Sequence, residues 1–285
     1  MSSETSNIKN RNSEFRRPIA WTIAGSDAGG GAGIQADLKV MNAFAVHGCT
    51  VITALTAQNT LGVHSVEPVS GSMLHAQLEA LACDLPPVAI KTGMLGSAAA
   101  CRALAGFLSG HQAPCPPLIC DPVLKSTSGA DLLDPAALDL LIGGIFPHAA
   151  VLTPNLPEVR QIIGEDAVQA EDAAARILET GAQSVLIKGG HADGNECSDY
   201  WTDGAQSMWL SSPRIETRAS HGTGCILSAA IAAAIALGHS IPEAVITAKT
   251  FLNQCLRSPA HVGSGRGPMM IQPFRNDPQD RPTIR

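Results

Sequence analysis

The 285-residue sequence lacks the cysteine and histidine spacings that mark metal-binding knuckles and disulfide frameworks. Its eight cysteines are scattered with no C-x-x-C pair, and its histidines form neither an i, i+4 pair nor a pair at zinc-finger spacing. These absences argue against a structural metal site and against a small fold held together by disulfides. We therefore expect reduced cysteines and a cytoplasmic setting.

The sequence also has little clustered positive charge and no long hydrophobic run. The formal net charge is −6 and, apart from Arg16-Arg17, Lys and Arg are not clustered, which argues against nucleic-acid binding. The longest apolar run, Ile226 to Leu237, is too short to span a bilayer and is interrupted by Ser228. We expect this run to form a buried core helix, and we expect neither nucleic acid nor a membrane as a partner.

Length and composition predict one large folded domain. With 285 residues, 45% of them hydrophobic, the chain can build a packed core without disulfides. Residues 1–17 are polar and mixed in charge without an apolar segment, so they predict a disordered leader and not a signal peptide. We expect residues 18–270 to form the domain and residues 271–285 to form a loose C-terminal tail.

Short apolar runs alternate with amphipathic segments along the chain, which predicts an α/β fold. The expected strands are Ile19 to Ala24, Thr50 to Ala57, Val88 to Lys91, Pro117 to Cys120, Ala149 to Leu152 and Ser184 to Ile187. The expected helices between them are Ile34 to Val46, Ser72 to Cys83, Ala98 to Leu108, Asn155 to Ile163 and Glu171 to Thr180. Repeated β-α units imply a doubly wound, mainly parallel sheet with helices on both faces.

A hairpin pattern follows the last of these units. Tyr200-Trp201 and Met208-Trp209-Leu210 flank Asp203-Gly204, which predicts a small antiparallel edge on the sheet. In open sheets of this kind ligands bind beyond the carboxyl ends of the strands, so the loops after the strands are where we expect the chemistry.

The segment Ser220-His221-Gly222-Thr223-Gly224-Cys225 precedes the apolar run and predicts an anion site at the start of a helix. The first amides of a helix lack intrahelical partners and the macrodipole is positive there, so the amides from Gly222 to Cys225 can bind a phosphate. Cys225 falls in the first turn, where a thiol pKa is usually lowered and a thiolate could take a proton from a substrate hydroxyl. Together these features suggest phosphoryl transfer, with a tight turn before a core helix as the alternative.

A second glycine-rich loop, from Gly25 to Gly33, follows the first expected strand. Its glycines allow close approach of the backbone to a ligand. The loop does not match G-x-G-x-x-G in register and lacks the Lys-Ser/Thr of the phosphate-binding loop. The first absence argues against a Rossmann dehydrogenase, and the second argues against a P-loop NTPase. Any nucleotide is therefore expected to bind in another way.

The segment Thr153-Pro154-Asn155-Leu156-Pro157-Glu158 ends a strand and starts a helix. Asn155 followed by Glu158 three positions later resembles a capping box, which is a purely local device. The functional interpretation is that both residues hold a hydrated Mg²⁺, which needs only one or two protein oxygens. The two interpretations are compatible.

Seven segments, taken together and in order, carry a resemblance to a known family. They are A-G-S-D-A-G-G-G-A-G-I-Q-A-D-L-K, T-A-L-T-A-Q-N-T, K-T-G-M-L-G, C-D-P-V-L, L-T-P-N-L-P-E, I-K-G-G-H and H-G-T-G-C. From about Ile19 to Pro268 the chain resembles the hydroxymethylpyrimidine/phosphomethylpyrimidine kinases of the ribokinase-like superfamily. Ribokinase relatives usually have an Asp as base where this chain, like the pyrimidine kinases, has Cys225.

The resemblance implies a ribokinase-like fold and two successive ATP-dependent phosphorylations on the way to thiamine. The acceptors would be 4-amino-5-hydroxymethyl-2-methylpyrimidine and its monophosphate, with ATP and Mg²⁺ as cofactors and, by family analogy, a homodimer as the assembly. Cys225 would be the base beside the Gly222 and Gly224 amides, and the amide of Gln58 could match the ring edge of an aminopyrimidine. The other implied residues are Asp37, Gly25, Met94 and Val123 for the substrate, Asn155, Lys188 and Thr223 for the nucleotide, and Glu158 and Asp121 for the metal.

Two other functions stay open on the sequence. A pyridoxal or pyridoxine kinase of the same superfamily would share the sheet, the metal motif and the anion turn, because a fold does not fix a substrate. A non-catalytic sensor would bind the pyrimidine without transferring phosphate. The presence of Cys225, Asn155 and Glu158 argues against the sensor, because a pure binder needs neither a base nor a metal.

Overall fold

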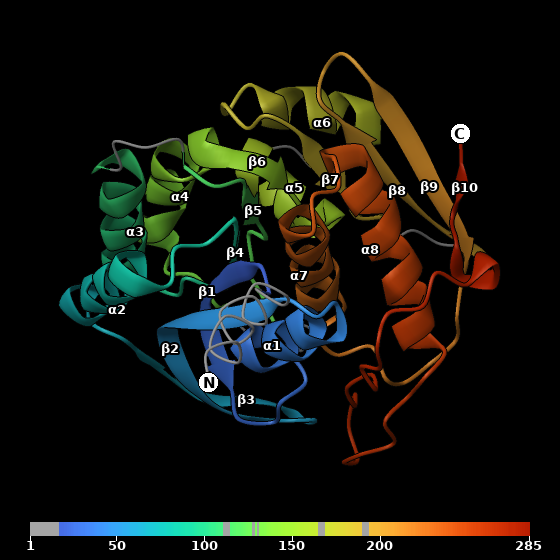
Figure 1. Ribbon diagram of the computed structural model, residues 1–285, viewed down its shortest axis with the longest axis horizontal. Helices are drawn as coiled ribbons and strands as arrows, with labels where there is room; N and C mark the ends of the chain where they lie inside the picture. Colours follow the sequence, from blue (N-terminus) through green and yellow to red (C-terminus); the bar gives the residue numbers. More distant parts are fainter. Residues whose placement is uncertain (1–16, 111–114, 127–128, 130, 165–168, 190–193) are drawn as a thin grey trace, which may run out of the picture.

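One mixed β-sheet organises the protein, as Figure 1 shows for a computed structural model. The structure describes residues 17–110, 115–126, 129, 131–164, 169–189 and 194–285, so the predicted leader lies, except for Arg17, outside the described residues. The sheet has ten strands in the order β10-β9-β8-β7-β6-β5-β4-β1-β2-β3. Strands β1, β2, β4, β5, β6 and β7 pair in parallel, and antiparallel strands lie at both edges.

The predicted strands are all present. Their observed bounds are β1 Ile19–Asp27, β2 His47–Asn59, β3 Gly62–Pro68, β4 Ala89–Thr92, β5 Leu118–Cys120, β6 Ala149–Leu152, β7 Val185–Ile187, β8 Glu196–Thr202, β9 Ser207–Pro213 and β10 Thr283–Ile284. The predicted hairpin is β8–β9. The sequence analysis did not predict β3, whose side chains are exposed or half-buried and so show no alternating apolar pattern.

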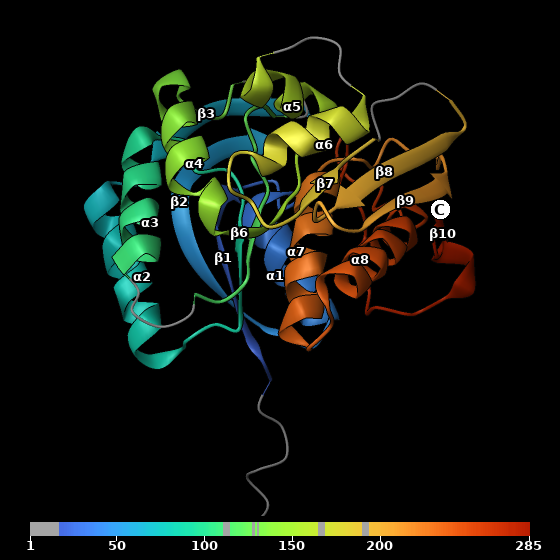
Figure 2. The ribbon, with the colours of Figure 1, turned by 90° about the horizontal axis from the view of Figure 1, so that it is seen from above.

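Helices cover both faces of the sheet, which confirms the doubly wound α/β prediction. Their bounds are α1 Gly33–Ala43, α2 Gly71–Asp84, α3 Ala98–Gly110, α4 Leu138–Gly144, α5 Leu156–Ile163, α6 Ala170–Leu178, α7 Thr223–Ala236 and α8 Ile241–Leu256. One hydrophobic core joins the sheet to α2 through α6, and the other joins it to α1, α7 and α8 (Figures 1 and 2). Helix α7 is buried along most of its length, as its apolar run predicts.

The C-terminal segment differs from the expected loose tail. Residues Thr283 and Ile284 form β10 against β9, and the Asp280 carboxylate lies 2.9 Å from Nε of Arg257, which follows the last residue of α8. Phe274 stacks on Phe44 with ring centroids 4.9 Å apart. Sequence polarity suggested a tail without structure, but edge pairing and these contacts with distant elements order it.

Within the described residues, no helix is long and apolar enough to cross a membrane.

Candidate active site

A row of polar side chains crosses the sheet near the carboxyl ends of its parallel strands. Residues two apart on a strand point to the same face of the sheet. On the face covered by α1, α7 and α8, five strands show a step in which an apolar side chain is followed two residues later by a polar one. These steps are Ala20 to Thr22 on β1, Ala89 to Lys91 on β4, Ile119 to Asp121 after β5, Val151 to Thr153 after β6, and Leu186 to Lys188 after β7. Charges and hydroxyls from distant parts of the sequence therefore meet beneath the start of α7.

A cavity of about 910 Å³ opens above this row. Its wall contains twelve of the thirteen residues expected at the site, and the part formed by Thr217, Arg218, Leu252, Leu256 and their neighbours extends toward α8. Gly25, Met94 and Val123 line it as expected. The one expected residue absent from its lining is Asp37.

Helix α7 points its first turn into the cavity. The helix begins at Thr223 after Gly222, whose φ of 86° is left-handed, and Gly222, Thr223, Gly224 and Cys225 all line the cavity. A Cβ on Gly222 would lie only 2.0 Å from the backbone oxygen of Gly31, so glycine is required for the close contact between the two glycine-rich segments. The predicted helix start is thus present, and its first amides face a space that can hold a phosphate.

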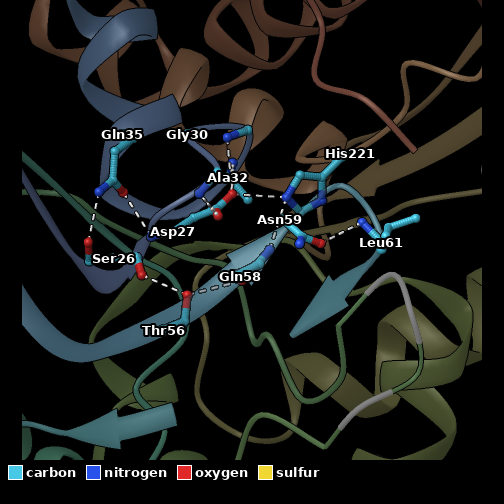
Figure 3. Close-up of polar contacts among 12 residues, drawn as sticks. Ser26, Asp27, Gly30, Ala32, Gln35, Thr56, Gln58, Asn59, Leu61 and His221 are labelled. Atoms are coloured by element: carbon cyan, nitrogen blue, oxygen red, sulfur yellow. Dashed lines mark hydrogen bonds and ion pairs between the residues drawn. The ribbon is translucent and has the colours of Figure 1, made fainter. Parts of the chain in front are cut away.

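The glycine loop after β1 is held by Asp27, which the sequence analysis did not single out. The Asp27 carboxylate accepts hydrogen bonds from the amides of Gly29, Gly31 and Ala32, at 2.8 to 3.0 Å (Figure 3). Burial alone would raise its pKa, but the hydrogen bonds from His221 and from these amides hold the pKa below its usual value. An Asp that precedes several glycines was the available sequence signal, since its oxygens can accept from loop amides.

His221 joins this loop to Gln58 across the cavity. Its Nε2 lies 2.9 Å from Asp27 Oδ2 and 3.0 Å from Gln58 Nε2, as Figure 3 shows. Gln58 lies on β2, and its Oε1 accepts from the hydroxyl of Thr56. Since His221 Nε2 donates its hydrogen to Asp27, it cannot also accept one from Gln58, so Thr56 orients the Gln58 amide at the cavity wall, where a ring edge was expected to bind.

Lys188 and two carboxylates form the charged side of the cavity. Lys188 Nζ lies 2.7 Å from Asp121 Oδ1 and 3.9 Å from Glu158 Oε2. Burial would lower the pKa of Lys188, but the two carboxylates outweigh burial and raise it, so the side chain is an ammonium. A Cβ on Gly224 would lie 3.2 Å from Nζ, which places this cation beside the first turn of α7.

The capping box predicted at the start of α5 is present. Asn155 Oδ1 accepts from the Glu158 amide at 2.9 Å, and Glu158 Oε2 accepts from the Asn155 amide at 2.8 Å. Burial raises the pKa of the Glu158 carboxyl to about 7, while Lys188 opposes the shift. Glu158 thus both caps the helix and lines the cavity beside Asp121, so the two interpretations of this motif are compatible in the structure.

Cys225 lies in the first turn of α7, but its electrostatics differ from the prediction. Burial raises the pKa of the thiol to about 11, although the Lys91 charge and an amide hydrogen bond from Gly33 act in the opposite direction. The expected lowering of the Cys225 pKa by the helix start is therefore wrong. Removal of the sulfur from water outweighs the favourable charges around it.

Asp37 is placed differently from the expected substrate contact. Its side chain is fully buried beneath the cavity, where Oδ2 accepts from Thr22 and lies 2.7 Å from Lys91 Nζ. Lys91 belongs to the K-T-G-M-L-G segment but was not singled out as a functional residue. The sequence did offer a sign of its role. Lys91 ends the apolar run of a strand, and the alternation of side chains along a strand places it on an inward-facing position.

A doubly wound sheet that directs the start of a glycine-capped helix into a charged cavity is the architecture of ribokinase-like kinases, and the chain is an enzyme of that class. Within the class, the family model described as phosphomethylpyrimidine kinase matches residues 27–270, so the chain belongs to the phosphomethylpyrimidine kinase family.

Three relatives illustrate the relationship. A hydroxymethylpyrimidine/phosphomethylpyrimidine kinase of Rhizobium meliloti is 47% identical over 260 residues, which cover 88% of this chain and 96% of the relative. The phosphomethylpyrimidine kinase structure from Clostridium difficile is 38% identical, with a TM-score of 0.73 over 84% of this chain and 99% of that one. The pyridoxal kinase of Staphylococcus aureus in complex with AMP-PCP and pyridoxal is 31% identical, with a TM-score of 0.83 over 95% of this chain and 98% of that one.

Proposed function

We propose that the enzyme transfers the γ-phosphoryl group of ATP to 4-amino-5-hydroxymethyl-2-methylpyrimidine, and then phosphorylates the monophosphate to the diphosphate, in thiamine biosynthesis. The observation that carries the proposal is the position of the α7 start. It lies in one cavity between the Gln58–His221 pair on one side and Lys188 with its two carboxylates on the other. An acceptor ring and a nucleotide can therefore meet at the same amides.

The Gln58 side of the cavity suits an aminopyrimidine. The primary amide offers one acceptor oxygen and two donor hydrogens, which can pair with a ring nitrogen and the adjacent amino group. Met94 and Val123 supply apolar surface of the same cavity against which a flat ring can pack. The hydrogen bond from Thr56 restricts the orientation of the amide and so reduces the cost of ordering it on binding.

The Lys188 side suits the phosphates of ATP. We propose that Lys188, Thr223 and Asn155 contact the nucleotide and that the amides from Gly222 to Cys225 stabilise the charge on the migrating phosphoryl group. Asp121 and Glu158 fit a hydrated Mg²⁺, because two carboxylates in one cavity are the donor set that this ion commonly uses beside substrate phosphates. When bound there, Mg²⁺ would neutralise phosphate charge.

The first transfer needs a proton acceptor. The acceptor hydroxyl oxygen forms a bond to the γ-phosphorus, the bond from that phosphorus to the β–γ bridging oxygen breaks, and ADP leaves. We propose that the hydroxyl proton passes to the Cys225 thiolate and forms its S–H bond. In a loose transition state this proton leaves late, so a base that is a thiolate for only part of the time suffices.

The second phosphoryl transfer depends less on a general base than the first. A phosphate monoester has a second pKa of about 6, so its attacking oxygen is already largely deprotonated at neutral pH. The α7 amides and Lys188 would contribute to both transfers, since both move a phosphoryl group, whereas Cys225 would act as a base mainly in the first.

A coupled assay of ADP formation tests the function. The pyrimidine alcohol, its monophosphate and pyridoxine are offered singly and in competition, each with ATP and Mg²⁺. We expect both pyrimidines to be phosphorylated with a kcat/KM well above that of pyridoxine. Preference for pyridoxine would favour a pyridoxal-type kinase, and the pyridoxal kinase of S. aureus is similar in fold to this chain. Pyrimidine binding without ADP formation would favour a sensor.

Replacement of Cys225 by alanine tests the role of the thiol. We expect Cys225→Ala to fold and to bind both substrates, while turnover of the alcohol falls by about 10² to 10⁴, the usual contribution of a general base. Turnover of the monophosphate should fall much less. The two acceptors are compared in single-turnover measurements on one preparation, and alcohol turnover near that of the unmodified enzyme would contradict the role.

We also propose a cytoplasmic homodimer. Family analogy supports the dimer, and Leu55 and Leu61, on β2 and in the turn after it, are exposed large hydrophobic side chains near one edge of the sheet. Sedimentation equilibrium of the full chain measures the assembly.

A further inference from the structure

Lys91 and Asp37 form an ion pair that has no exposed surface. Both side chains are 0% exposed, and Lys91 Nζ lies 2.7 Å from Asp37 Oδ2. The charge of Asp37 raises the pKa of Lys91 against the effect of burial, so the lysine is an ammonium. Within the described part of the chain, Asp37 Oδ1 has no hydrogen-bond partner. A buried carboxylate oxygen without a donor is costly, so this pair is not arranged for stability alone.

The position of the pair is next to the reaction site. Asp37 lies on α1, which packs against α7, and Lys91 lies on β4, which α7 also covers. A Cβ on Gly93 would lie 2.7 Å from Lys91 Nζ, so the ammonium extends along β4 toward the end of the strand that leads to Met94 of the cavity wall. The ammonium is thus beneath the floor of the cavity.

The charges of four side chains act on the Cys225 thiol. Burial raises the pKa of the thiol, Lys91 lowers it, and the Asp37 and Asp121 carboxylates raise it. Lys188, beside the first turn of α7, also interacts with the sulfur. Asp121 and Lys188 line the cavity, whereas Lys91 and Asp37 do not and have no exposed surface, so Lys91 and Asp37 are the pair that acts on the sulfur from within the protein.

We propose that Lys91 and Asp37 are positioning residues for the transfer reaction: the Lys91 ammonium stabilises the anionic Cys225 sulfur from beneath the cavity, and the Asp37 carboxylate holds that ammonium in place and limits its effect. Neither side chain touches substrate, because neither reaches the cavity. The inference rests on the proposed role of Cys225 and extends it to two residues outside the cavity wall.

The test measures how fast iodoacetamide alkylates Cys225 as the pH is raised, because only the thiolate reacts. Peptide mass spectrometry of the full-length enzyme resolves Cys225 from the other cysteines, and the exposed Cys83 in the same digest reports any general change in reactivity. Asp37→Asn removes a charge that raises the pKa of the Cys225 thiol. Asp121 and the sulfur itself still favour the Lys91 ammonium, which then acts on the sulfur without a competing partner. We expect alkylation about tenfold faster near pH 8, which corresponds to one pKa unit.

The double variant separates charge from loosening of the structure. If Asp37→Asn accelerates alkylation only because the cavity floor opens, the acceleration persists in Asp37→Asn/Lys91→Met. If Lys91 is the cause, the acceleration disappears in the double variant, and this is the expected result. Persistence of the acceleration, or no acceleration in Asp37→Asn, would overturn the proposal.

Lys91→Met provides a second, independent measurement if Asp37→Asn does not fold. We expect Cys225 to react about tenfold more slowly than in the unmodified enzyme near pH 9, because a buried cation near the sulfur has been lost. An unchanged rate would overturn the proposal. Lys249→Met is the matched control, since it breaks another buried pair, 2.6 Å from Asp199, on a different helix. It should leave the Cys225 rate unchanged.

These experiments can refute the positioning role of Lys91 and Asp37 without refuting the proposed function, and the reverse also holds. Alkylation reports the ionisation of Cys225 whether or not that residue acts as a base. Normal turnover of the alcohol by Cys225→Ala would refute the role of the thiol, whereas an unchanged alkylation profile in the Lys91 and Asp37 variants would refute the positioning pair.

Discussion

At the scale of single residues, burial decides the charge states at the site. Cys225 lies at a helix start that favours a thiolate, yet burial raises the pKa of its thiol to about 11. Asp27 is also buried, but hydrogen bonds from His221 and from the amides of Gly29 and Ala32 hold its pKa below the usual value. The difference is the number of donors that replace water around the anion.

Asp27→Asn tests this explanation through its dependence on pH. At pH 7 we expect the free energy of unfolding to fall by about 2 kcal/mol, because loop amides lose a charged acceptor. A carboxyl whose folded pKa is lowered contributes stability above its unfolded pKa of about 3.9 and loses it as the pH falls through the folded pKa. The difference in free energy of unfolding between Asp27→Asn and the unmodified enzyme should therefore become smaller in acid.

Urea unfolding at a series of pH values measures the gap. Asp84→Asn, which changes an exposed carboxylate at the end of α2, serves as the control and should leave stability within about 0.5 kcal/mol at every pH. A difference in free energy of unfolding that stays constant down to about pH 2 would contradict the explanation. It would show that the changed shape of the side chain, and not its lost charge, destabilises Asp27→Asn.

At the scale of elements, the start of α7 depends on a glycine at a contact between two loops. Gly222 at one end of the helix and Gly238 after the other both have left-handed φ, 86° and 93°. Only Gly222 is crowded: its Cβ would meet the Gly31 oxygen at 2.0 Å, whereas no atom lies within 4 Å of a Cβ on Gly238. The two positions therefore separate backbone conformation from close contact.

Alanine at each glycine makes a matched comparison. Gly238→Ala should cost about 1 to 2 kcal/mol from the left-handed conformation alone and leave turnover unchanged. Gly222→Ala should cost more and reduce turnover, because the helix start and the Gly31 loop have to separate. Thermal unfolding and the ADP assay measure both effects, and equal losses in the two variants would contradict the role of the contact.

At the scale of the whole molecule, the C-terminal segment ties the last strands and helices together. It pairs with β9, stacks Phe274 on Phe44, and brings the Asp280 backbone oxygen 2.8 Å from Nδ2 of Asn253 on α8. Helix α8 in turn lines the far end of the cavity through Leu252 and Leu256. The segment thus supports one wall of the site from a distance.

Two truncations test this support. Removing residues 271–285 should lower the free energy of unfolding by about 3 kcal/mol or more, since loss of a packed Phe side chain alone costs about that much. Removing residues 282–285 deletes only the short edge strand β10, and should cost much less. Urea unfolding compares the two, and a negligible effect of the longer deletion would mean that residues 271–285 are loose after all.

The sequence alone predicted most of the architecture, and most of the residues it proposed for the site line one cavity. Runs of apolar residues and their period give strands and helices because burial follows local pattern, and the G-T-G-C turn marked the start of α7. Helix α8 was not predicted, since its buried face includes Lys249, Asn253 and Gln254. Their partners, among them Asp199, Ser212 and the Pro273 oxygen, are far away in the sequence.

Only the tertiary structure decided the electrostatics. The pairing of Asp37 with Lys91, the engagement of His221 by Asp27 and the raised pKa of the Cys225 thiol each join residues from separate strands and loops. Local pattern determines which residues turn inward. The charge that an inward group carries depends on water removed and on partners brought by other elements, and a linear sequence contains neither quantity.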